Sequence, residues 1–322
     1  MFRKSWLALM LTLMVSCFTG PPAWAQAWPT KPIRWVLPFP PGGPSDNISR
    51  AVARHLATRL GQPVVVENRP GANGGIGTAA VARMPPDGYT VLLGTSGTHT
   101  INPHLYTNLQ YDALKDFAPI SAINDYVGVL VVSSGSSIKS VQDLIAAAKA
   151  QPGNLTFGSS GQGSSNHMVT EMFGALANLK FTHVPYKGDA LALTDLMGGQ
   201  LSFMITTIPF GNQFARAGKV RLLGTTGPKR HQSLPDLPAL NEIVPGLESV
   251  NWLGLFAPAN TPKEIVARLA KEIGEIVVLP DMKDVFTGVD VAPSTPEVFA
   301  KRVRDDYLNW QDIVKKTGVR LE

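Results

Sequence analysis

Two glycine- and serine-rich loops carry the residues whose types and spacing best suit binding chemistry. Each loop follows a short apolar run and precedes a segment with helical periodicity. The residues concerned are Pro41, Gly42, Gly43, Pro44, Ser45 and Asp46 in the first loop, and Ser159, Ser160, Gly161, Gly163, Ser164, Ser165 and His167 in the second. Glycines let the backbone approach a ligand, and the first N–H groups of a helix are free donors beside a partial positive charge. Both loops therefore predict a site for a carboxylate or a phosphate.

An ordinary connection between a strand and a helix explains either loop by itself. Ser45 or Asp46 is placed to cap the helix after the first loop, and the serines of the second loop can both cap a helix and donate to a ligand. Because the same arrangement occurs twice, in distant parts of the chain, we expect a cleft in which both loops face one acidic ligand.

Further residues join this predicted site because they lie at the end of a predicted strand or just before a predicted helix. They are Thr95, Ser96, Thr98, Tyr186, Lys187, Gly188 and Thr206. Ligands of open α/β sheets bind at the carboxyl ends of the strands, where the threonines and Ser96 are expected. His99 fits either a site role or a structural role.

Reactive groups for catalysis are harder to find. The sequence has no Gly-x-Ser-x-Gly elbow, no His-Glu-x-x-His pair and no Walker loop, and its six histidines lack metal-ligand spacing. Gly75, Gly77 and Ala80 match part of a dinucleotide fingerprint, but they do not directly follow a strand. We therefore predict no catalytic residue, cofactor or metal. The alternative is an α/β hydrolase that uses a serine of residues 159–165.

The first residues have the pattern of a secretory signal peptide. Arg3 and Lys4 precede an apolar stretch at residues 7–15, and residues 23–25 match a small-x-small cleavage site. We predict that residues 1–25 are removed and that the mature protein is exported. The single cysteine, Cys17, lies in this segment, so the mature chain would have no disulfide. Lipidation of Cys17 is the alternative to cleavage after residue 25.

The charge balance argues against nucleic acid as a partner. Without Arg3 and Lys4, 27 basic residues stand against 24 acidic ones, and the lysines and arginines form no cluster. The aromatic residues are scattered, so the sequence shows neither a basic stripe nor a stacking platform. The mature chain exceeds the usual size of a single domain, which predicts two lobes.

Strands and helices alternate along the chain, which predicts α/β lobes with mainly parallel sheets. Strands are predicted at residues 33–37, 63–67, 89–94, 127–132, 155–158, 201–205, 220–224 and 252–257. The chain is expected to leave the first lobe near residues 117–123 and to return along the strand at 220–224. The first lobe would then contain residues 26–122 and 224–322, with the last helix (296–316) packed on it, and the second lobe residues 123–223.

An ordered set of motifs resembles the Bug family, the periplasmic solute-binding proteins of tripartite tricarboxylate transporters. The motifs lie at residues 28–33, 39–46, 66–72, 86–90 and 184–188. The resemblance covers essentially the whole mature chain. It implies a type II periplasmic-binding-protein fold, with two α/β lobes around a ligand cleft and two hinge crossings.

The same resemblance implies a periplasmic monomer that binds a small carboxylate and delivers it to the membrane permease subunits of such a transporter. In the family, backbone donors, hydroxyls and ordered water hold the carboxylate, at positions that match residues 42–46 and 159–165 here. A ligand-sensing partner of a signalling system is the alternative reading. The sequence does not name the acid.

Two positions depart from the family pattern. An aspartate is common where Thr206 stands, and a small residue is usual at Asp189. An acid at position 206 would meet a ligand amine, so its absence favours a plain mono- or dicarboxylate over an amino acid. The carboxylate of Asp189 would either face solvent or exclude an anionic tail, and the sequence leaves both open.

Overall fold

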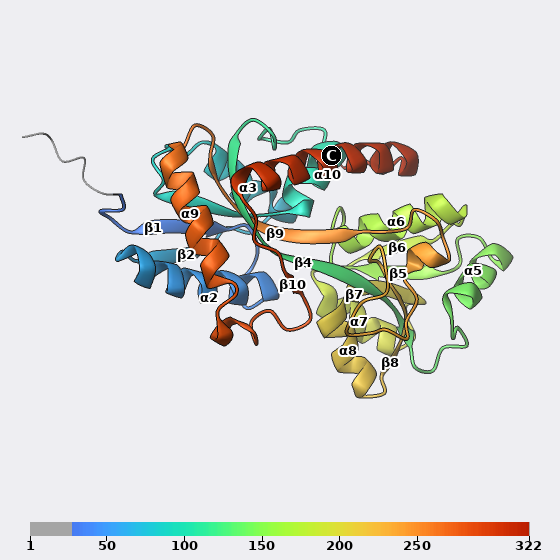
Figure 1. Ribbon diagram of the computed structural model, residues 1–322. Helices are drawn as coiled ribbons and strands as arrows, with labels where there is room; N and C mark the ends of the chain where they lie inside the picture. Colours follow the sequence, from blue (N-terminus) through green and yellow to red (C-terminus); the bar gives the residue numbers. More distant parts are fainter. Residues whose placement is uncertain (1–27, 322) are drawn as a thin grey trace, which may run out of the picture.

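The computed structural model describes residues 28–321, so the predicted signal peptide lies outside the described residues. These residues form two α/β lobes built on one ten-stranded sheet (Figure 1). The strand order is β2-β1-β3-β9-β4-β7-β5-β6, and β8 and β10 also pair with β4. Among the helices of residues 28–321, none combines the length and the hydropathy that a bilayer-spanning segment requires.

Lobe 1 contains the first half of the strand order. Its elements are β1 (Ile33–Leu37), α2 (Pro44–Leu60), β2 (Val64–Asn68), η2 (Ala72–Gly74), α3 (Gly75–Ala82), β3 (Thr90–Thr95), η3 (Gly97–Ile101), α4 (Asn102–Leu105), β9 (Val250–Pro258), α9 (Lys263–Ile276), η5 (Pro280–Met282) and β10 (Asp290–Val291). Successive side chains of a strand point to opposite faces. Trp35 therefore packs with α2 and α9, whereas Val36 packs with α3 on the other face.

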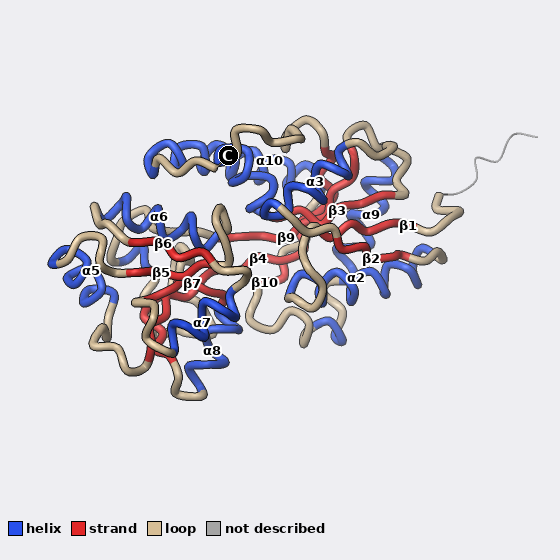
Figure 2. Tube along the Cα trace, turned by 180° about the vertical axis from the view of Figure 1, so that it is seen from behind, coloured by secondary structure: helices blue, strands red, loops and turns tan. Residues whose placement is uncertain are grey.

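Lobe 2 contains the second half. Its elements are α5 (Val141–Ala150), β5 (Thr156–Ser159), α6 (Ser165–Ala177), β6 (Thr182–Pro185), α7 (Asp189–Met197), β7 (Phe203–Thr207), α8 (Ile208–Arg216), β8 (Val220–Thr225) and η4 (Leu240–Glu242). Phe203 packs toward α5 and α6, and Met204 packs toward α7 and α8. Figure 2 shows these helices on both sides of the strands.

The first connection between the lobes is a single strand, β4 (Phe117–Ser133). Its first part pairs with β9, and its last part pairs with β7 and β8. The sequence predicted a strand only at residues 127–132, which is too short, because β4 already begins at Phe117. Phe117, Ile120 and Ile123 are buried as part of the same strand, so the chain crosses without leaving the sheet.

The second connection is β9, which lies beside β4 between the lobes (Figure 1). The predicted return strand, β8, instead pairs with residues 129–133 of β4. Leu240 and Leu247 follow β8 and still belong to the core cluster of Phe157 in lobe 2. We therefore propose that lobe 2 extends from near residue 123, as expected, to about residue 249 rather than to 223.

The last helix, α10 (Pro296–Thr317), contacts both lobes. Phe299 and Val303 pack with Trp252 in the core of lobe 1, as the sequence predicted. Trp310 and Val314 belong to a cluster that joins Ile101 and Leu105 of lobe 1 to the core of lobe 2, and α10 also contacts α6, which the sequence did not predict. The helix is therefore a third link between the lobes, in addition to β4 and β9.

Local signals set several helix ends. Gly61 ends α2 in the left-handed conformation, with a φ of 68°, and Ser140 caps α5 through a 3.0 Å bond from the Asp143 N–H. In contrast, α9 begins without a side-chain cap, because Pro262 is its N-cap residue and the Thr261 hydroxyl donates to the Pro258 carbonyl.

Candidate functional site

Loops from both lobes meet at the junction of the lobes. The parallel strands β1, β2 and β3 of lobe 1 and β5, β6 and β7 of lobe 2 each lead into a loop and a helix. A hydrogen bond joins the two sets of loops directly, because the Asn73 amide donates to the Gly163 carbonyl over 2.8 Å. The structure thus brings the glycine-rich turn after β2 into contact with the second predicted loop, and the contact does not involve residues 41–46.

The first loop leaves its backbone open. Pro41, Gly42 and Pro44 are exposed, and no heavy atom lies within 4 Å of an added Cβ at Gly42 or Gly43. The half-exposed Ser45 does not cap α2, and neither does Asp46, because Gly43 is the N-cap and no side chain bonds to the helix start. The predicted cap is therefore wrong.

Asp46 instead fixes the loop from inside. Its buried carboxylate accepts hydrogen bonds from Arg50 Nε (2.9 Å), Asn68 Nδ2 (3.0 Å) and the Gly42 N–H (3.1 Å). The bond from Arg50 is the main reason that the pKa of Asp46 is lowered to about 2. Asp46 is therefore an ionised support of the loop rather than a group free to contact a ligand.

Asn73 is a junction residue that the sequence did not select. Residues 71–74 all take positive φ angles, including 48° at Asn73, a conformation that asparagine tolerates better than most residues. Its side chain also donates to Asn102 Oδ1 over 3.0 Å. In the sequence, the feature that could have indicated Asn73 is its position within a run of glycines.

Thr95, Ser96 and Thr98 are buried behind the junction. Thr95 and Thr98 each accept a hydrogen bond from the other's N–H, and the Ser96 hydroxyl donates to Asn251 Oδ1 over 2.9 Å. His99 is fully buried and stacks on Phe256, and burial lowers the pKa of His99 to about 3. These residues hold the end of β3 in place, so the structural reading of His99 applies.

Asn166 organises the second loop. Its Oδ1 accepts from Ser160 Oγ (3.1 Å) and Ser164 Oγ (2.6 Å), and its Nδ2 donates to Asp189 Oδ1 (2.9 Å) and to the Ile205 carbonyl (3.1 Å). Ser164 is the N-cap residue of α6, but its hydroxyl is not bonded to the helix start, contrary to expectation. Asn166 thus joins the loops that follow β5, β6 and β7.

Two stacked histidines support this loop from behind. His167 accepts from the Gly163 N–H over 3.1 Å, and its ring lies 3.8 Å from that of His183. His183 Nε2 lies 2.6 Å from Ser159 Oγ. A hydrolase would need such a contact between a base and a nucleophile, but Ser159 is fully buried. Burial lowers the pKa of His167 to about 3 and that of His183 to about 4, so both rings are neutral.

The segment after β6 contributes mainly backbone. The Tyr186 N–H donates to the Ser159 carbonyl, and the Gly188 N–H donates to that of Ser160. The Tyr186 hydroxyl donates a hydrogen bond to Asp195 Oδ2 over 2.7 Å, and the Lys187 side chain is exposed. The segment therefore positions the serine loop, and the Tyr186 hydroxyl is already engaged.

The two positions that depart from the family pattern meet here. The Thr206 hydroxyl donates to Asp189 Oδ2 over 2.6 Å, and burial raises the pKa of Asp189. Tyr126, which the sequence also did not select, lies on β4 and faces Ser165, Asp189 and Ser96. Burial raises the pKa of Tyr126 to about 12. In the sequence, the feature that could have indicated Tyr126 is the polar run just before the predicted apolar strand at residues 127–132.

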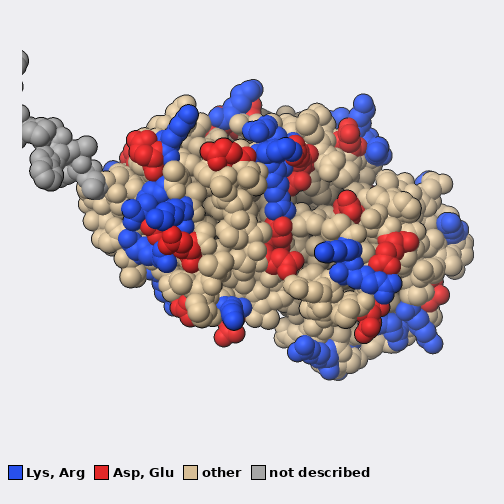
Figure 3. Space-filling model, in the orientation of Figure 1, with Lys and Arg blue, Asp and Glu red and all other residues tan. Residues whose placement is uncertain are grey.

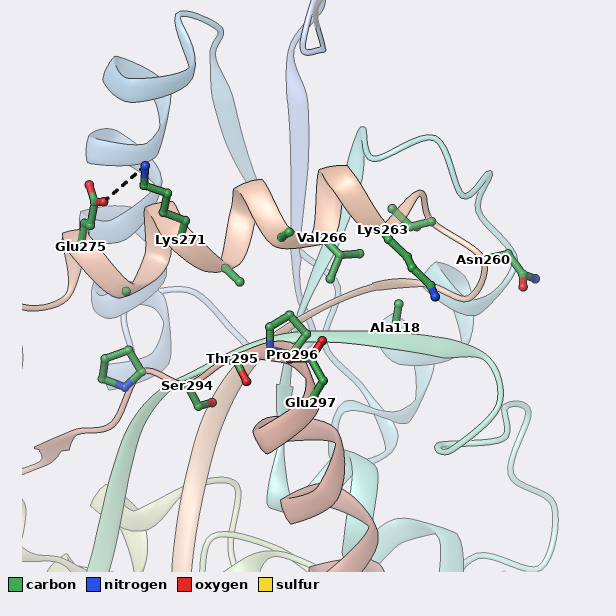
Figure 4. A pocket seen from close by; sticks show the side chains of 15 residues that line it. Ala118, Asn260, Lys263, Val266, Lys271, Glu275, Ser294, Thr295, Pro296 and Glu297 are labelled. Carbon is green, nitrogen blue, oxygen red and sulfur yellow. Dashed lines mark ion pairs between the residues drawn. The ribbon is translucent and has the colours of Figure 1, made fainter.

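Two concavities lie away from these loops. A groove of about 1030 Å³ runs between α9 and the start of α10, with Val266 and Pro296 in its lining and Lys271 facing Glu275 at its end (Figure 4). A smaller one of about 180 Å³ lies beside Arg302 and Trp310. Neither contains a predicted site residue. Lysines and arginines lie next to acidic residues on the face that Figure 3 shows.

The two α/β lobes face each other with the ends of their strands and the starts of their helices, and β4 and β9 connect them. This arrangement is typical of a solute-binding receptor. Residues 48–319 match the family model described as "Tripartite tricarboxylate transporter family receptor", and the chain belongs to this family. The type II periplasmic-binding-protein fold and the family predicted from the motifs are thereby confirmed. Since the family consists of solute-binding receptors, the protein is not an enzyme, and the hydrolase alternative is wrong.

Individual relatives agree with this assignment. Protein BugT of Bordetella pertussis is 33% identical over 320 residues, which cover 98% of each chain. A structure of R. palustris Rpa4515 with adipate is 34% identical, with a TM-score of 0.83, and covers 91% of this chain and 99% of that one. MatC of Rhodopseudomonas palustris with bound malate is 30% identical, with a TM-score of 0.80, over 89% of this chain and all of that one.

Proposed function

We propose that this protein is an exported, periplasmic receptor that binds a small carboxylate between its lobes and delivers it to the permease subunits of a tripartite tricarboxylate transporter. The observation that carries the proposal is the contact between the two lobes at their loop ends, where Asn73, in the turn after β2, donates to Gly163 of the second predicted loop. Similar proteins with adipate and malate support the ligand class. A monomer without a cofactor suffices for this role.

The proposed site divides its residues into contact and support. The residues placed to contact the ligand are those with exposed or half-exposed backbone or hydroxyl groups: Gly42, Gly43, Ser45, Ser160, Gly161 and Ser165. The helix starts of α2 and α6 add partial positive charge beside them. Asp46, Asn166 and His167 hold these loops in place through the bonds described above.

A thermal-shift screen tests the proposal. The probes are malate, succinate, glutarate and adipate, each beside its uncharged diamide, together with 4-aminobutyrate, 5-aminopentanoate and 6-aminohexanoate. A ligand that binds only the folded state adds about 2.7 kcal/mol of stability at about 100 times its dissociation constant. We expect at least one acid to raise the Tm and its diamide to leave it unchanged, because N–H donors and helix starts favour a carboxylate. Equal shifts by acids and diamides, or no shift by any acid, would contradict the proposal.

The partner requires a separate experiment. We expect the ligand-loaded protein to bind the permease subunits in detergent and to support uptake of the same acid into vesicles that contain them. Capture of a histidine kinase in place of the permease would instead support the signalling alternative.

A further inference from the structure

The carboxylate of Asp189 occupies the positive end of lobe 2. Three helices begin around it: α6 at Ser165, α7 at Asp189 itself and α8 at Ile208. Asn166 of α6 donates to one oxygen over 2.9 Å, and Thr206, two residues before α8, donates to the other over 2.6 Å. Since helix starts attract anions, the protein supplies an anion of its own to the place where a ligand carboxylate would otherwise bind.

This carboxylate has no cationic partner within residues 28–321. No lysine, arginine or histidine there forms an ion pair with it, and the groups that stabilise its charge are the neutral Thr206, Asn166 and Ser160. Tyr126, which faces it from β4, is also neutral. The hydrogen bonds from Asn166 and Thr206, together with Ser160, use at most three of its about four lone-pair sites, so acceptor capacity remains.

The Asp189 carboxylate is half-buried and has no cationic side chain beside it, which is unfavourable unless a cation compensates it, and this desolvation raises the pKa of Asp189. A ligand ammonium group would supply that cation, whereas a second ligand carboxylate would meet a like charge. The charge of Asp189 thus favours an acid that also carries an ammonium group over a diacid, whereas the N–H donors of the loops bind the carboxylate of either one.

Building on the proposed function, we propose that Asp189 determines specificity and that the ligand carries an ammonium group, paired with Asp189, in addition to its carboxylate. The ligand carboxylate then lies at the start of α2, where the backbone of Gly42 and Gly43 is open. The absence of an acid at position 206 had favoured a plain carboxylate. The proposed pairing reverses that expectation, because Thr206 donates a hydrogen bond to the carboxylate of Asp189 and so holds an acid beside position 206.

Isothermal titration with matched probes tests the inference. Succinate, glutarate and adipate are compared with 4-aminobutyrate, 5-aminopentanoate and 6-aminohexanoate, which replace one carboxylate by an ammonium group at similar length. In the parent we expect the amino acid of the best pair to bind more tightly than its diacid. In Asp189→Asn we expect the amino acid to lose about 30-fold in affinity and the diacid to gain about tenfold, because the charge that separates them is gone.

Asp143→Asn is the matched control, because Asp143 also lies in the first turn of a lobe 2 helix but is exposed. It should leave all affinities unchanged. Thr206→Val keeps the charge of Asp189 and removes its support, so the preference for the amino acid should persist with a weaker affinity. The Tm of each unliganded variant shows whether it folds.

The outcomes separate this inference from the proposed function. If diacids bind and Asp189→Asn does not tighten them, the role of Asp189 is wrong while carboxylate binding stands. If neither series binds, and the acids of the thermal-shift screen do not bind either, both proposals fail together.

Discussion

Gly43 allows a test of the lobe 1 half of the site at the scale of one residue. Its φ of −85° suits any residue, and an added Cβ meets no atom within 4 Å. We expect Gly43→Val to change the free energy of unfolding by less than about 0.5 kcal/mol. The ligand should bind at least about tenfold more weakly, because the side chain blocks the approach to the start of α2. Titration with the best acid of the thermal-shift screen measures the loss.

Gly135→Val is the matched control for this variant. Gly135 lies in a turn of lobe 2 and also has no atom within 4 Å of an added Cβ. Gly161 is less suitable, because its φ of 139° would add strain to any effect on binding. If Gly43→Val and Gly135→Val bind the acid equally well, the ligand does not approach the first loop.

At the scale of an element, Asp46 ties the start of α2 to β2 and to its own first loop. We expect Asp46→Asn to lower the free energy of unfolding by about 1 to 3 kcal/mol near pH 7, the range for hydrogen bonds to a charged group. The pKa of Asp46 falls from 3.8 to about 2 on folding, so its stabilisation is complete above pH 3.8 and is lost as the pH falls toward 2. Urea unfolding at a series of pH values measures both effects.

The difference between the parent and Asp46→Asn should therefore shrink as the pH falls through this window. Asp312→Asn, an exposed position in α10, serves as the control and should show no such convergence. A constant difference down to about pH 2 would mean that the charge of Asp46 does not stabilise the start of α2.

At the scale of the whole molecule, the lobes touch through Asn73 and Gly163 on one side and through Gln232 and Asp290 elsewhere, the latter at 3.1 Å. We expect ligand to reduce the radius of gyration measured by X-ray scattering, because the contact requires the lobes to approach. Asn73→Ala removes the bond to Gly163 between the lobes and the bond to Asn102 within lobe 1. We expect the form with the lobes in contact to hold the ligand, so this variant should bind about 1 kcal/mol more weakly and release the ligand faster.

Asn154→Ala, a loop residue of lobe 2 whose amide bonds only locally to Gln151, is the control and should bind normally. A radius of gyration that stays constant at saturation would remove lobe closure from the mechanism. Normal binding by Asn73→Ala would show that the contact with Gly163 does not stabilise the complex with the ligand.

The sequence by itself determined the local features of this protein. The apolar run at residues 33–37 became β1, Gly61 ended α2, and Ser140 capped α5, because strand burial, left-handed backbone and caps depend on neighbouring residues. The order of the motifs likewise determined the family. The contact roles of residues 42–46 and 159–165 remain predictions.

Only the tertiary structure decided how distant segments combine. Phe117–Ser133 is one strand because its two halves find partners in different lobes, and no local pattern reveals such pairing. Asp46 and Ser164 were predicted to be helix caps. Instead, Asp46 accepts hydrogen bonds from Arg50 and Asn68, and Ser164 donates one to Asn166. Asp189 and Thr206 are 17 positions apart in the chain and share one hydrogen bond. The charge of the site therefore depends on which strand ends the fold brings together, because electrostatic interactions act through space and not along the sequence.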